Sequence, residues 1–427
     1  MIDIRQIREN PEKFKKAAKD KHFDVGIDRL REIDSILKSQ KQQLQDISTE
    51  KNQIGKSIPK LDGAEKVNKL NRLSELKLFE ISINANIKSL QPEFDKLMFL
   101  VPQPADDDVP VGKDDTENVQ IRREGKIRQF NFEPKDHVQL GLALGIIDIE
   151  RGVKLAGTRN YFLKGDGALL HWAVLRFAAD FMVSKGYRPL SVPLLMKDEA
   201  MTGTGFFPGS EEQTYRMEKD QLNLAGTAEV PLTAYRMGEI LSADELPLKY
   251  FALSTCFRRE AGAAGKDTYG LYRIHQFDKV EQVVICQNSA EASNNFHDEI
   301  LANAEAVMAA LELPYRVVNV CTGDLGRGQA KKFDIEAWMP SRKNYCETHS
   351  ASKFYDFQTR RMNLRYKDPA TGRNRFCHTL NNTVIASPRI LIPILELYQN
   401  ADGSVTIPKV LRPYMGGKER ITSMQPC

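Results

Sequence analysis

Two series of apolar residues at seven-residue spacing constrain the first hundred residues of this 427-residue chain more than any other feature. Each series is a narrow apolar stripe on a helix of more than thirty residues, which is typical of a coiled coil. The segment "PKLDGAEK" between them contains Pro59 and Gly63, which favour a turn. We therefore expect an antiparallel α-helical hairpin within residues 1–103. The first series is Leu30, Ile33, Leu37, Leu44, Ile47, Ile54 and Ile58, and the second is Leu73, Leu76, Ile83, Ile87, Leu90, Phe94 and Leu97.

A zipper that joins two chains is the ordinary function of such a stripe. Two features of this sequence weaken that interpretation. Polar residues at Gln40, Lys51 and Glu80 interrupt the stripes, and the short turn pairs the two helices within one chain. At a rise of about 1.5 Å per residue the hairpin is an arm of roughly 45 Å or more. We expect so long an arm to reach a partner.

The rest of the chain has the pattern of an α+β domain. The Pro/Asp-rich segment "VPQPADDDVPVGKDD", residues 101–115, predicts a linker, and a second domain follows at 116–427. In it, strand-like runs such as "YFALSTCF" and "KVEQVVIC" alternate with helical runs such as "ALLHWAVLRFAADFMVSKG" and "ILIPILELYQ". Strands joined by hairpin-like loops, with helices grouped beside them, predict an antiparallel sheet flanked by helices.

Composition and missing motifs exclude several classes of protein. No apolar run approaches the roughly 18 residues needed to span a membrane, and the charged N-terminus predicts a cytoplasmic protein. The six cysteines are scattered without a CxxC pair, which argues against disulfides and against zinc. No GxxxxGKS/T loop is present, so the commonest nucleotide-binding loop is not supported. The net charge of +4 neither requires nor excludes a nucleic-acid partner.

The segment "CFRREAGAAGKDTYGLYRIHQFDKVE" concentrates charge around a Gly/Ala/Lys/Asp loop. If it forms a hairpin of two strands, alternation places Arg258 and Glu260 on one face before the loop, and Arg273, Phe277 and Glu281 on one face after it. Arginines fork onto phosphate oxygens, an aromatic ring stacks on a purine, and a carboxylate accepts from an ammonium group. A solvated salt-bridge face is the competing interpretation, but it does not require a central aromatic residue.

A second segment, "HTLNNTVIASPRILIPILE", adds polar groups to this picture. Ser387-Pro388 predicts an N-cap followed by proline at the first helical position, which places Arg389 at a helix N-terminus. Positive charge there is unfavourable to the helix itself, although the helix dipole favours an anion at that end. Asn381 and Thr383 share a strand face just before it. An ordinary capped helix is the competing interpretation.

Two shorter segments supply oxygen ligands. In "AGTAEVPL" we expect Thr227 and Glu229 to share a strand face. In "NYCETHSASKFYDFQTRR" Glu347 and Ser350 offer the hard oxygen ligands that Mg²⁺ takes beside phosphates. Either residue alone is an ordinary surface residue.

Over essentially its whole length the chain resembles a bacterial-type seryl-tRNA synthetase, a class II aminoacyl-tRNA synthetase. The segments "KGYRPLSVPLL", "FRREAGAAGKDTYGLYRIHQFDKVE" and "HTLNNTVIASPRILIPILE" are similar to class motifs 1, 2 and 3. The three motifs indicate only the class. The serine enzyme is indicated by the hairpin arm and by "TAEVPLTA", "MTGTGFFP", "DFQTRRMNLRYK" and "VLRPYMGG".

The resemblance implies a class II antiparallel sheet and an enzyme that forms seryl-adenylate from serine and ATP, then transfers serine to the 3′ end of tRNA(Ser). Transfer to tRNA(Sec) is a further expectation. It also implies a homodimer built through motif 1, with Pro193 at the interface, and a tRNA-binding arm. By the resemblance the catalytic residues are Arg258, Arg389 and Glu347. Those that bind ATP are Arg258, Glu260, Arg273, Phe277, Glu347, Ser350 and Arg389. Those that bind serine are Thr227, Glu229, Arg258, Glu281, Asn381 and Thr383. The Mg²⁺ ligands are Glu347 and Ser350, and zinc is not expected.

Four positions depart from the family pattern near the expected site. Cys346 stands where Arg is frequent, Lys353 where Asn is common, Phe206 in a run that is usually of the GTGQ type, and Thr383 where Ser is common. Three other functions compete with the serine–tRNA ligase. A ligase that loads a carrier protein lacks the arm, a silent tRNA-binding protein does not need Arg258, Glu281 and Arg389, and a duplicate enzyme for antibiotic self-resistance keeps every motif.

Overall fold

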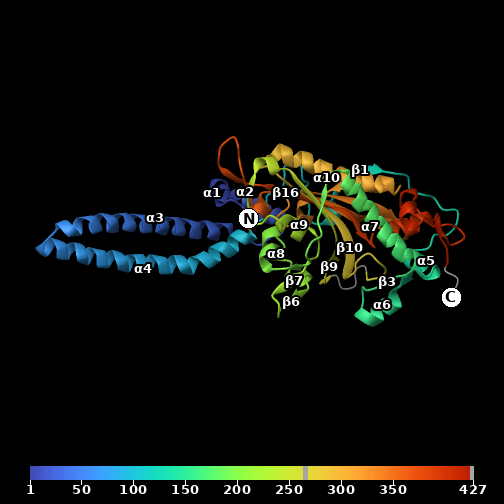
Figure 1. Cartoon of the computed structure of the whole chain (residues 1–427), viewed down its shortest axis with the longest axis horizontal. Coiled ribbons are helices and arrows are strands. Elements are labelled where there is room, and N and C mark those ends of the chain that lie inside the picture. The colour runs from blue at the N-terminus through green and yellow to red at the C-terminus, as the bar shows by residue number, and fades with distance from the viewer. Residues whose placement is uncertain (263–267, 424–427) are drawn as a thin grey trace. The chain divides into compact units, whose positions relative to one another are not determined.

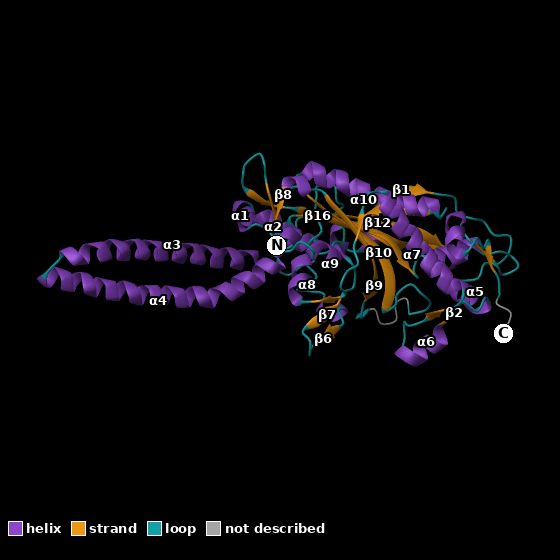
Figure 2. Cartoon of the chain, in the orientation of Figure 1, coloured by secondary structure: helices purple, strands orange, loops and turns teal. Residues whose placement is uncertain are grey.

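The computed structural model describes residues 1–262 and 268–423. Ala263 to Asp267, the tip of the charged loop expected from the sequence, and Cys427 lie outside the described residues. The chain forms two compact units, Met1–Pro104 and Ala105–Cys427 (Figure 1). The first is entirely helical and the second contains all the strands (Figure 2).

The first unit contains the expected antiparallel hairpin. Helices α1 (Ile4–Glu9) and α2 (Pro11–Asp20) precede the long helices α3 (Ile27–Ser57) and α4 (Gly63–Leu100). The turn between α3 and α4 is a short 3-10 segment, Ile58–Lys60, and Gly63 has a positive φ of 59°. The polar interruptions of the seam face each other: Lys51 Nζ lies 2.7 Å from Glu80 Oε2. The seam residues that are buried include Leu30, Ile33, Leu37, Ile54 and Leu76.

The second unit is built on an eight-stranded sheet with the order β1-β11-β12-β13-β16-β10-β9-β4. Every neighbouring pair is antiparallel except β4 with β9, which confirms the expected α+β class. These strands are β1 (Val119–Glu124), β4 (Arg188–Pro189), β9 (Leu248–Phe257), β10 (Gln276–Cys286), β11 (Tyr315–Asn319), β12 (Lys331–Met339), β13 (Asn344–Tyr355) and β16 (His378–Ser387).

Helices and smaller sheets cover the large sheet. The longer helices are α7 (Asp166–Ser184) and α10 (Ala290–Ala310). The other helices are α5 (His137–Ala143), α6 (Ile149–Ala156), α8 (Asp198–Thr204), α9 (Glu229–Ala234), α11 (Phe357–Met362) and α12 (Leu391–Tyr398). The remaining strands are β2 (Ile147–Asp148), β3 (Phe162–Leu163), β5 (Leu195–Met196), β6 (Arg216–Met217), β7 (Leu222–Leu224), β8 (Ile240–Ser242), β14 (Arg365–Lys367), β15 (Asn374–Phe376), β17 (Val405–Thr406) and β18 (Arg420–Ile421).

Strand β10 shows how the sheet separates its two faces. Val280, Val284 and Cys286 point into the main core, which α7, α10 and α12 complete. Lys279 and Glu281, with the opposite parity, line a pocket on the other face. Because side chains alternate along a strand, one face carries the core and the other is free to carry chemistry.

The structure also bears on the linker, the cysteines and the membrane spans considered above. Residues 105–115 are not a free linker, because Val109 is buried against Val318 and Val320 and the Asp106 amide donates to the carbonyl of Ala330. The five described cysteines are all free thiols. Among the described residues, no helix has the length and apolarity needed to cross a membrane.

Candidate active site

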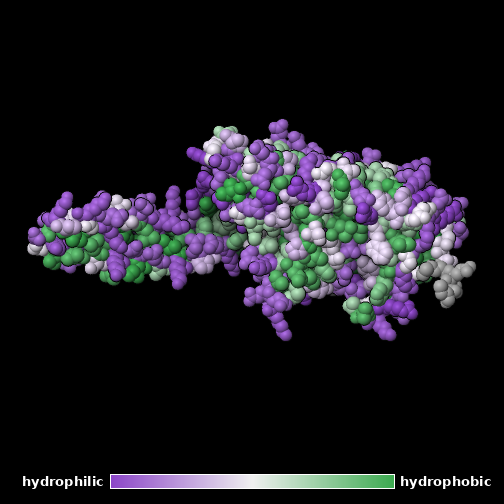
Figure 3. Space-filling model, viewed as in Figure 1, coloured by the Kyte–Doolittle hydropathy of each residue, from purple (hydrophilic) through white to green (hydrophobic). Residues whose placement is uncertain are grey.

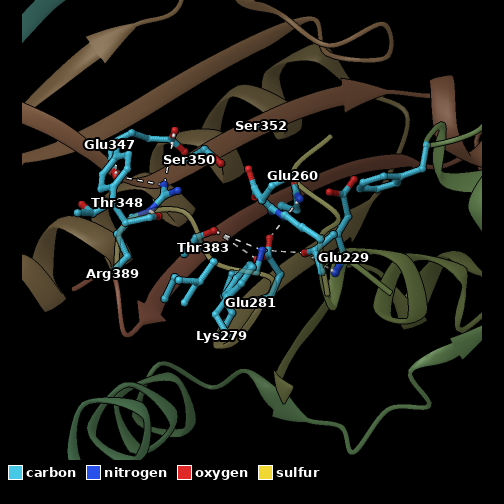
Figure 4. A pocket seen from close by; sticks show the side chains of 18 of the residues that line it. Glu229, Glu260, Lys279, Glu281, Glu347, Thr348, Ser350, Ser352, Thr383 and Arg389 are labelled. Carbon is cyan, nitrogen blue, oxygen red and sulfur yellow. Dashed lines mark hydrogen bonds and ion pairs between the residues drawn. The ribbon is translucent and has the colours of Figure 1, made fainter. Parts of the chain in front are cut away.

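One pocket of the second unit, about 800 Å³ with open solvent included, collects nearly all the side chains that the sequence nominates. Figure 4 shows Glu347, Ser350 and Arg389 grouped on one side of it and Glu229 on the other, with Thr383 and Glu281 between. The predicted residues that line it are Thr227, Glu229, Arg258, Glu260, Phe277, Glu281, Glu347, Ser350, Asn381, Thr383 and Arg389. Arg273 is not among the lining residues, and it donates from Nη1 to Glu260 Oε2 at 3.4 Å.

The two strands beside the charged loop are shorter than the alternation of side chains predicts. Strand β9 ends at Phe257 and β10 begins at Gln276, so Arg258, Glu260 and Arg273 lie in the connecting loop rather than on strand faces. The loop segments still pair, since the Arg258 amide donates to the carbonyl of His275 at 2.9 Å. Arg258 reaches the pocket nonetheless: its guanidinium lies 5.2 Å from the ring centre of Phe277, and its Nε donates to Gly226 O at 3.3 Å.

Arg389 organises the more exposed end of the pocket. Its Nε donates to the carbonyl of Tyr272 at 3.2 Å, and its guanidinium lies 4.3 Å from the centre of that ring. Its Nη1 is 3.8 Å from Glu347 Oε2 and donates to the Glu347 carbonyl at 3.3 Å. Desolvation acts to raise the pKa of Glu347, but Arg389 and three further cations outweigh it, so that pKa lies below its usual value.

The prediction that Ser387 is the N-cap of the helix beside Arg389 is wrong. Ser387 is the last residue of β16, and α12 starts at Leu391 with Ile390 at the N-cap position. The Ser387 hydroxyl instead lies 2.8 Å from His171 Nδ1. Arg389 therefore lies in the turn between β16 and α12, not at a capped helix N-terminus. Its contacts with Tyr272 and Glu347 position it there.

A β-bulge brings Glu347 and Ser350 to the same pocket. Three residues apart, they would point to opposite faces of a regular strand. The register of β12 with β13 shifts between Ile335 and Glu336, which leaves Thr348 without an opposite residue. Glu347, Thr348, Ser350 and Ser352 consequently all line the pocket. A carboxylate and a hydroxyl are oxygen donors that suit Mg²⁺, which keeps most of its ligands as water and phosphate.

The buried end of the pocket is centred on Glu281, whose exposed fraction is 1%. Asn381 Nδ2 donates to Glu281 Oε1 at 3.2 Å, and Thr383 Oγ1 donates to Oε2 at 3.4 Å. Lys279, which the sequence did not nominate, forms an ion pair with Glu281 and donates to Thr227 Oγ1 at 2.7 Å. Asn381 Oδ1 is buried and has no hydrogen-bond partner among the described residues. This end of the pocket therefore offers an unsatisfied acceptor to a ligand that can donate a hydrogen bond.

Glu229 completes this end from a different element than expected. Thr227 and Glu229 do not share a strand face: Glu229 is the first residue of α9, and its amide donates to Thr227 Oγ1 at 3.1 Å. Desolvation raises the pKa of Glu229 to about 7, and the Glu281 carboxylate adds to the rise. Lys279 and the amide of Gln358, which donates to Glu229 Oε1 at 2.8 Å, act against it.

Two of the four family departures belong to the pocket and two do not. Phe206 and Thr383 are lining residues. Lys353 is on the other side of β13, where its ammonium pairs with Asp106 at 2.6 Å. Cys346 is partly buried against the main core. The departures that line the pocket are therefore an aromatic ring and one methyl group.

Comparisons with known proteins show the family of the chain. Residues 1–104 match the Seryl-tRNA synthetase N-terminal domain, and residues 213–398 match the tRNA synthetase class II core domain (G, H, P, S and T). A serine–tRNA ligase of Deinococcus radiodurans is 45% identical over 98% of each chain. The chain belongs to the seryl-tRNA synthetases. It is thus an ATP-dependent aminoacyl-tRNA ligase of class II, with the activity of a serine–tRNA ligase.

Solved structures place the synthetase in the same family. The seryl-tRNA synthetase of Pyrococcus horikoshii, complexed with ATP, superposes with a TM-score of 0.94 at 37% identity and covers both chains fully. The cytoplasmic serine–tRNA ligase of Naegleria fowleri, in complex with AMP, gives 0.87 at 32% identity over 97% of this chain and 96% of the other. The prolyl-tRNA synthetase of Giardia lamblia shares only the fold, with a TM-score of 0.57 at 14% identity over 65% and 54%.

Proposed function

We propose that the pocket binds ATP at the end of Arg389 and serine at the end of Glu281, with Arg258 between them. The observation that carries this proposal is the difference between the two ends: Arg389 lies beside the partly exposed Glu347 at one end, and the buried carboxylates of Glu229 and Glu281 lie at the other. At the ATP end, Phe277 stacks on adenine, Glu260 contacts adenine or ribose, and Arg273 binds the distal phosphates. Arg389 covers the other face of adenine and reaches the γ-phosphate, and Arg258 holds the α-phosphate.

At the serine end, the ammonium group is bound by Thr227, Glu229 and Glu281. Thr383 and Glu281, beside Asn381, bind the side-chain hydroxyl, and Arg258 holds the carboxylate. The buried Asn381 Oδ1 supports this assignment, since a hydroxyl or ammonium donor satisfies it. A site built to hydrogen-bond a hydroxyl rejects alanine, because the same buried groups are then left unpaired.

The first step of the reaction needs alignment more than proton transfer. An oxygen of the serine carboxylate attacks the α-phosphorus, the bond to the bridging oxygen breaks, and pyrophosphate leaves. No strong base is required, so Arg258 and Arg389 act by holding the reactants in line and by balancing negative charge. In the second step the 3′-terminal ribose hydroxyl of tRNA attacks the seryl carbonyl, and AMP leaves.

Glu347 and Ser350 are the residues that would hold Mg²⁺. The ion supplies charge neutralisation between phosphate oxygens when bound. The lowered pKa of Glu347 supports this assignment, since an ionised carboxylate is the ligand that Mg²⁺ requires.

We propose further that the hairpin arm binds the tRNA. The end of the arm, residues 51–77, is rich in basic residues, which suits a phosphate backbone. RNA helices are recognised largely by shape and backbone, so the arm needs charge and reach rather than base-reading groups. The basic residues there are Lys51, Lys56, Lys60, Lys66, Lys69, Arg72 and Lys77, against Asp62, Glu65 and Glu75.

A homodimer through motif 1 is the third part of the proposal. Pro193 is exposed, and α7 and β5 of the same unit carry apolar side chains that a lone subunit leaves in water. Trp172 and Val183 of α7 are 62% and 55% exposed, and Leu195 of β5 is 49% exposed. Figure 3 shows apolar side chains on the surface of the second unit among charged ones. Sedimentation of the intact chain tests the dimer, and we place the enzyme in the cytoplasm.

The experiment that tests the two-part function separates the two steps. Deleting Leu37 to Leu90 should leave serine-dependent ATP–pyrophosphate exchange intact and abolish charging of tRNA(Ser). Charging of tRNA(Sec), measured beside it with the intact chain, tests whether that tRNA is also a substrate. Equal loss of exchange and charging in the shortened chain would contradict the proposed division of labour.

A further inference from the structure

A buried histidine outside the pocket is hydrogen-bonded to the loop that supports the ATP end. His137 is the first residue of α5 and is 5% exposed, and Glu396 of α12 is fully buried beside it. Neither residue lines the pocket. His137 contacts the segment that returns from the charged loop to β10 through the amide of Leu271, and Glu396 is hydrogen-bonded to His137.

The hydrogen bonds on the two sides of the ring indicate which tautomer of this histidine the site favours. Glu396 Oε1 lies 2.8 Å from His137 Nδ1 and accepts from the His137 amide at 3.1 Å. Ser341 donates to the same carboxylate from its hydroxyl at 2.8 Å and from its amide at 2.9 Å. On the other side of the ring, Nε2 accepts from the Leu271 amide at 3.2 Å. An amide only donates, so Nε2 carries no proton and Nδ1–H donates to Glu396.

The loop approaches the ring so closely that its sequence is constrained. A Cβ on Gly270 would lie 2.2 Å from His137 Nε2, and the φ of Gly270 is +76°. The next residue, Leu271, lines the pocket and is fully buried. The residue after that, Tyr272, lies under the guanidinium of Arg389 and accepts from its Nε. The residue bonded to the histidine is thus followed directly by the residue that contacts the arginine.

We propose that His137 is a positioning residue for the ATP end of the site. Oriented by Glu396, it fixes the Leu271 amide, so that Tyr272 stands where it holds Arg389. The proposal rests on the assignment of this end to ATP. Its prediction is selective: weakening this hydrogen bond impairs the use of ATP and leaves the affinity for serine at the other end nearly unchanged.

Two substitutions at the same position separate this role from simple packing. Asparagine places its amide nitrogen near Nδ1 and keeps the donor to Glu396, whereas glutamine reaches the position of Nε2 and keeps a partner for Leu271. We expect His137→Asn to raise the KM for ATP about tenfold, roughly the worth of one hydrogen bond. The KM for serine should change less than twofold, and His137→Gln should recover most of the KM for ATP.

The measurement is serine-dependent ATP–pyrophosphate exchange with both KM values, together with the melting temperature of each variant. Gly270→Ala reaches the same contact from the loop side and should reproduce the ATP-selective defect even where a substitution of His137 fails to fold. The proposal is overturned if both KM values rise equally, if the KM for ATP does not change, or if Asn and Gln behave alike. Absence of exchange in the unaltered enzyme would instead contradict the proposed function.

Discussion

The two ends of the pocket differ in how deeply their charged groups are buried. At the ATP end, the side chains of Arg389 and Glu347 are 21% and 48% exposed. At the serine end, Glu229 and Glu281 are 8% and 1% exposed. A polyphosphate needs strong, fixed cations and tolerates water, whereas recognition of one hydroxyl requires groups that water cannot satisfy. Catalysis at the phosphates and selection of the amino acid therefore take place in separate environments, which Arg258 joins.

The largest effect should come from the group that joins the two ends. Arg258→Ala removes the guanidinium assigned to both the α-phosphate and the serine carboxylate, and we expect exchange to fall by about 10³-fold or more. Binding of tRNA, measured by filter retention, should remain near that of the unaltered enzyme. Arg259→Ala is the matched control, because the adjacent Arg259 does not line the pocket and its side chain is 48% exposed.

A loss of exchange no larger than that of the control would contradict the comparison between the two ends. If Arg258→Ala reduced exchange no more than Arg259→Ala does, the pocket would not contain a group shared by the two substrates. The assignment of its two ends would then have to be made again.

A reciprocal pair of substitutions tests whether the ends are separate. Glu281→Gln removes the charge of a buried hydrogen-bond acceptor, and such bonds are worth about 1.5–3 kcal/mol, or roughly 10- to 150-fold in kcat/KM for serine. Its KM for ATP should stay within about twofold. Glu260→Gln should do the reverse, raising the KM for ATP and sparing serine. Parallel changes in both substrates for both variants would show one undivided site.

The serine end should also respond to pH where the ATP end does not. The pKa of Glu229 is raised to about 7, so this carboxylate gains a proton as the pH falls through neutrality and loses the charge that attracts the serine ammonium. We expect the KM for serine to rise about tenfold between pH 8 and pH 6. The pKa of Glu347 lies below its usual value, so it stays ionised over the same range. With Mg²⁺ in excess, a KM for ATP that rose in parallel would contradict the comparison.

Periodicity predicted the parts of the molecule that repeat. The seven-residue stripes indicate α3 and α4 because a long helix must keep one face apolar, and Lys51 and Glu80 interrupt both stripes because they pair across the hairpin. Alternation likewise indicated β9 and β10 and the shared face of Asn381 and Thr383. In each case a local pattern determines the environment of every residue in the element.

At the site, the backbone is irregular, and periodicity did not predict the positions of several side chains. The bulge at Thr348 turns Glu347 and Ser350 to one face, and no sequence period reports an unpaired residue. Arg258 and Glu229 reach the pocket from a loop and from the start of a helix, which alternation treated as strands. Lys279 lies on the predicted face of β10, and the signal that identifies it is its buried carboxylate partner two residues along the chain, Glu281. Such positions depend on tertiary contacts.

The most direct test of the buried end is amino-acid-dependent ATP–pyrophosphate exchange with serine, threonine, alanine, glycine and cysteine. The structure predicts exchange with serine alone, because only serine both fits beside Thr383 and satisfies the buried groups of Asn381 and Glu281. Alanine and glycine lack the hydroxyl and should fall below serine by about 10⁴-fold in kcat/KM. Exchange with alanine or glycine at a rate close to that with serine would contradict the claim that these buried groups select the substrate.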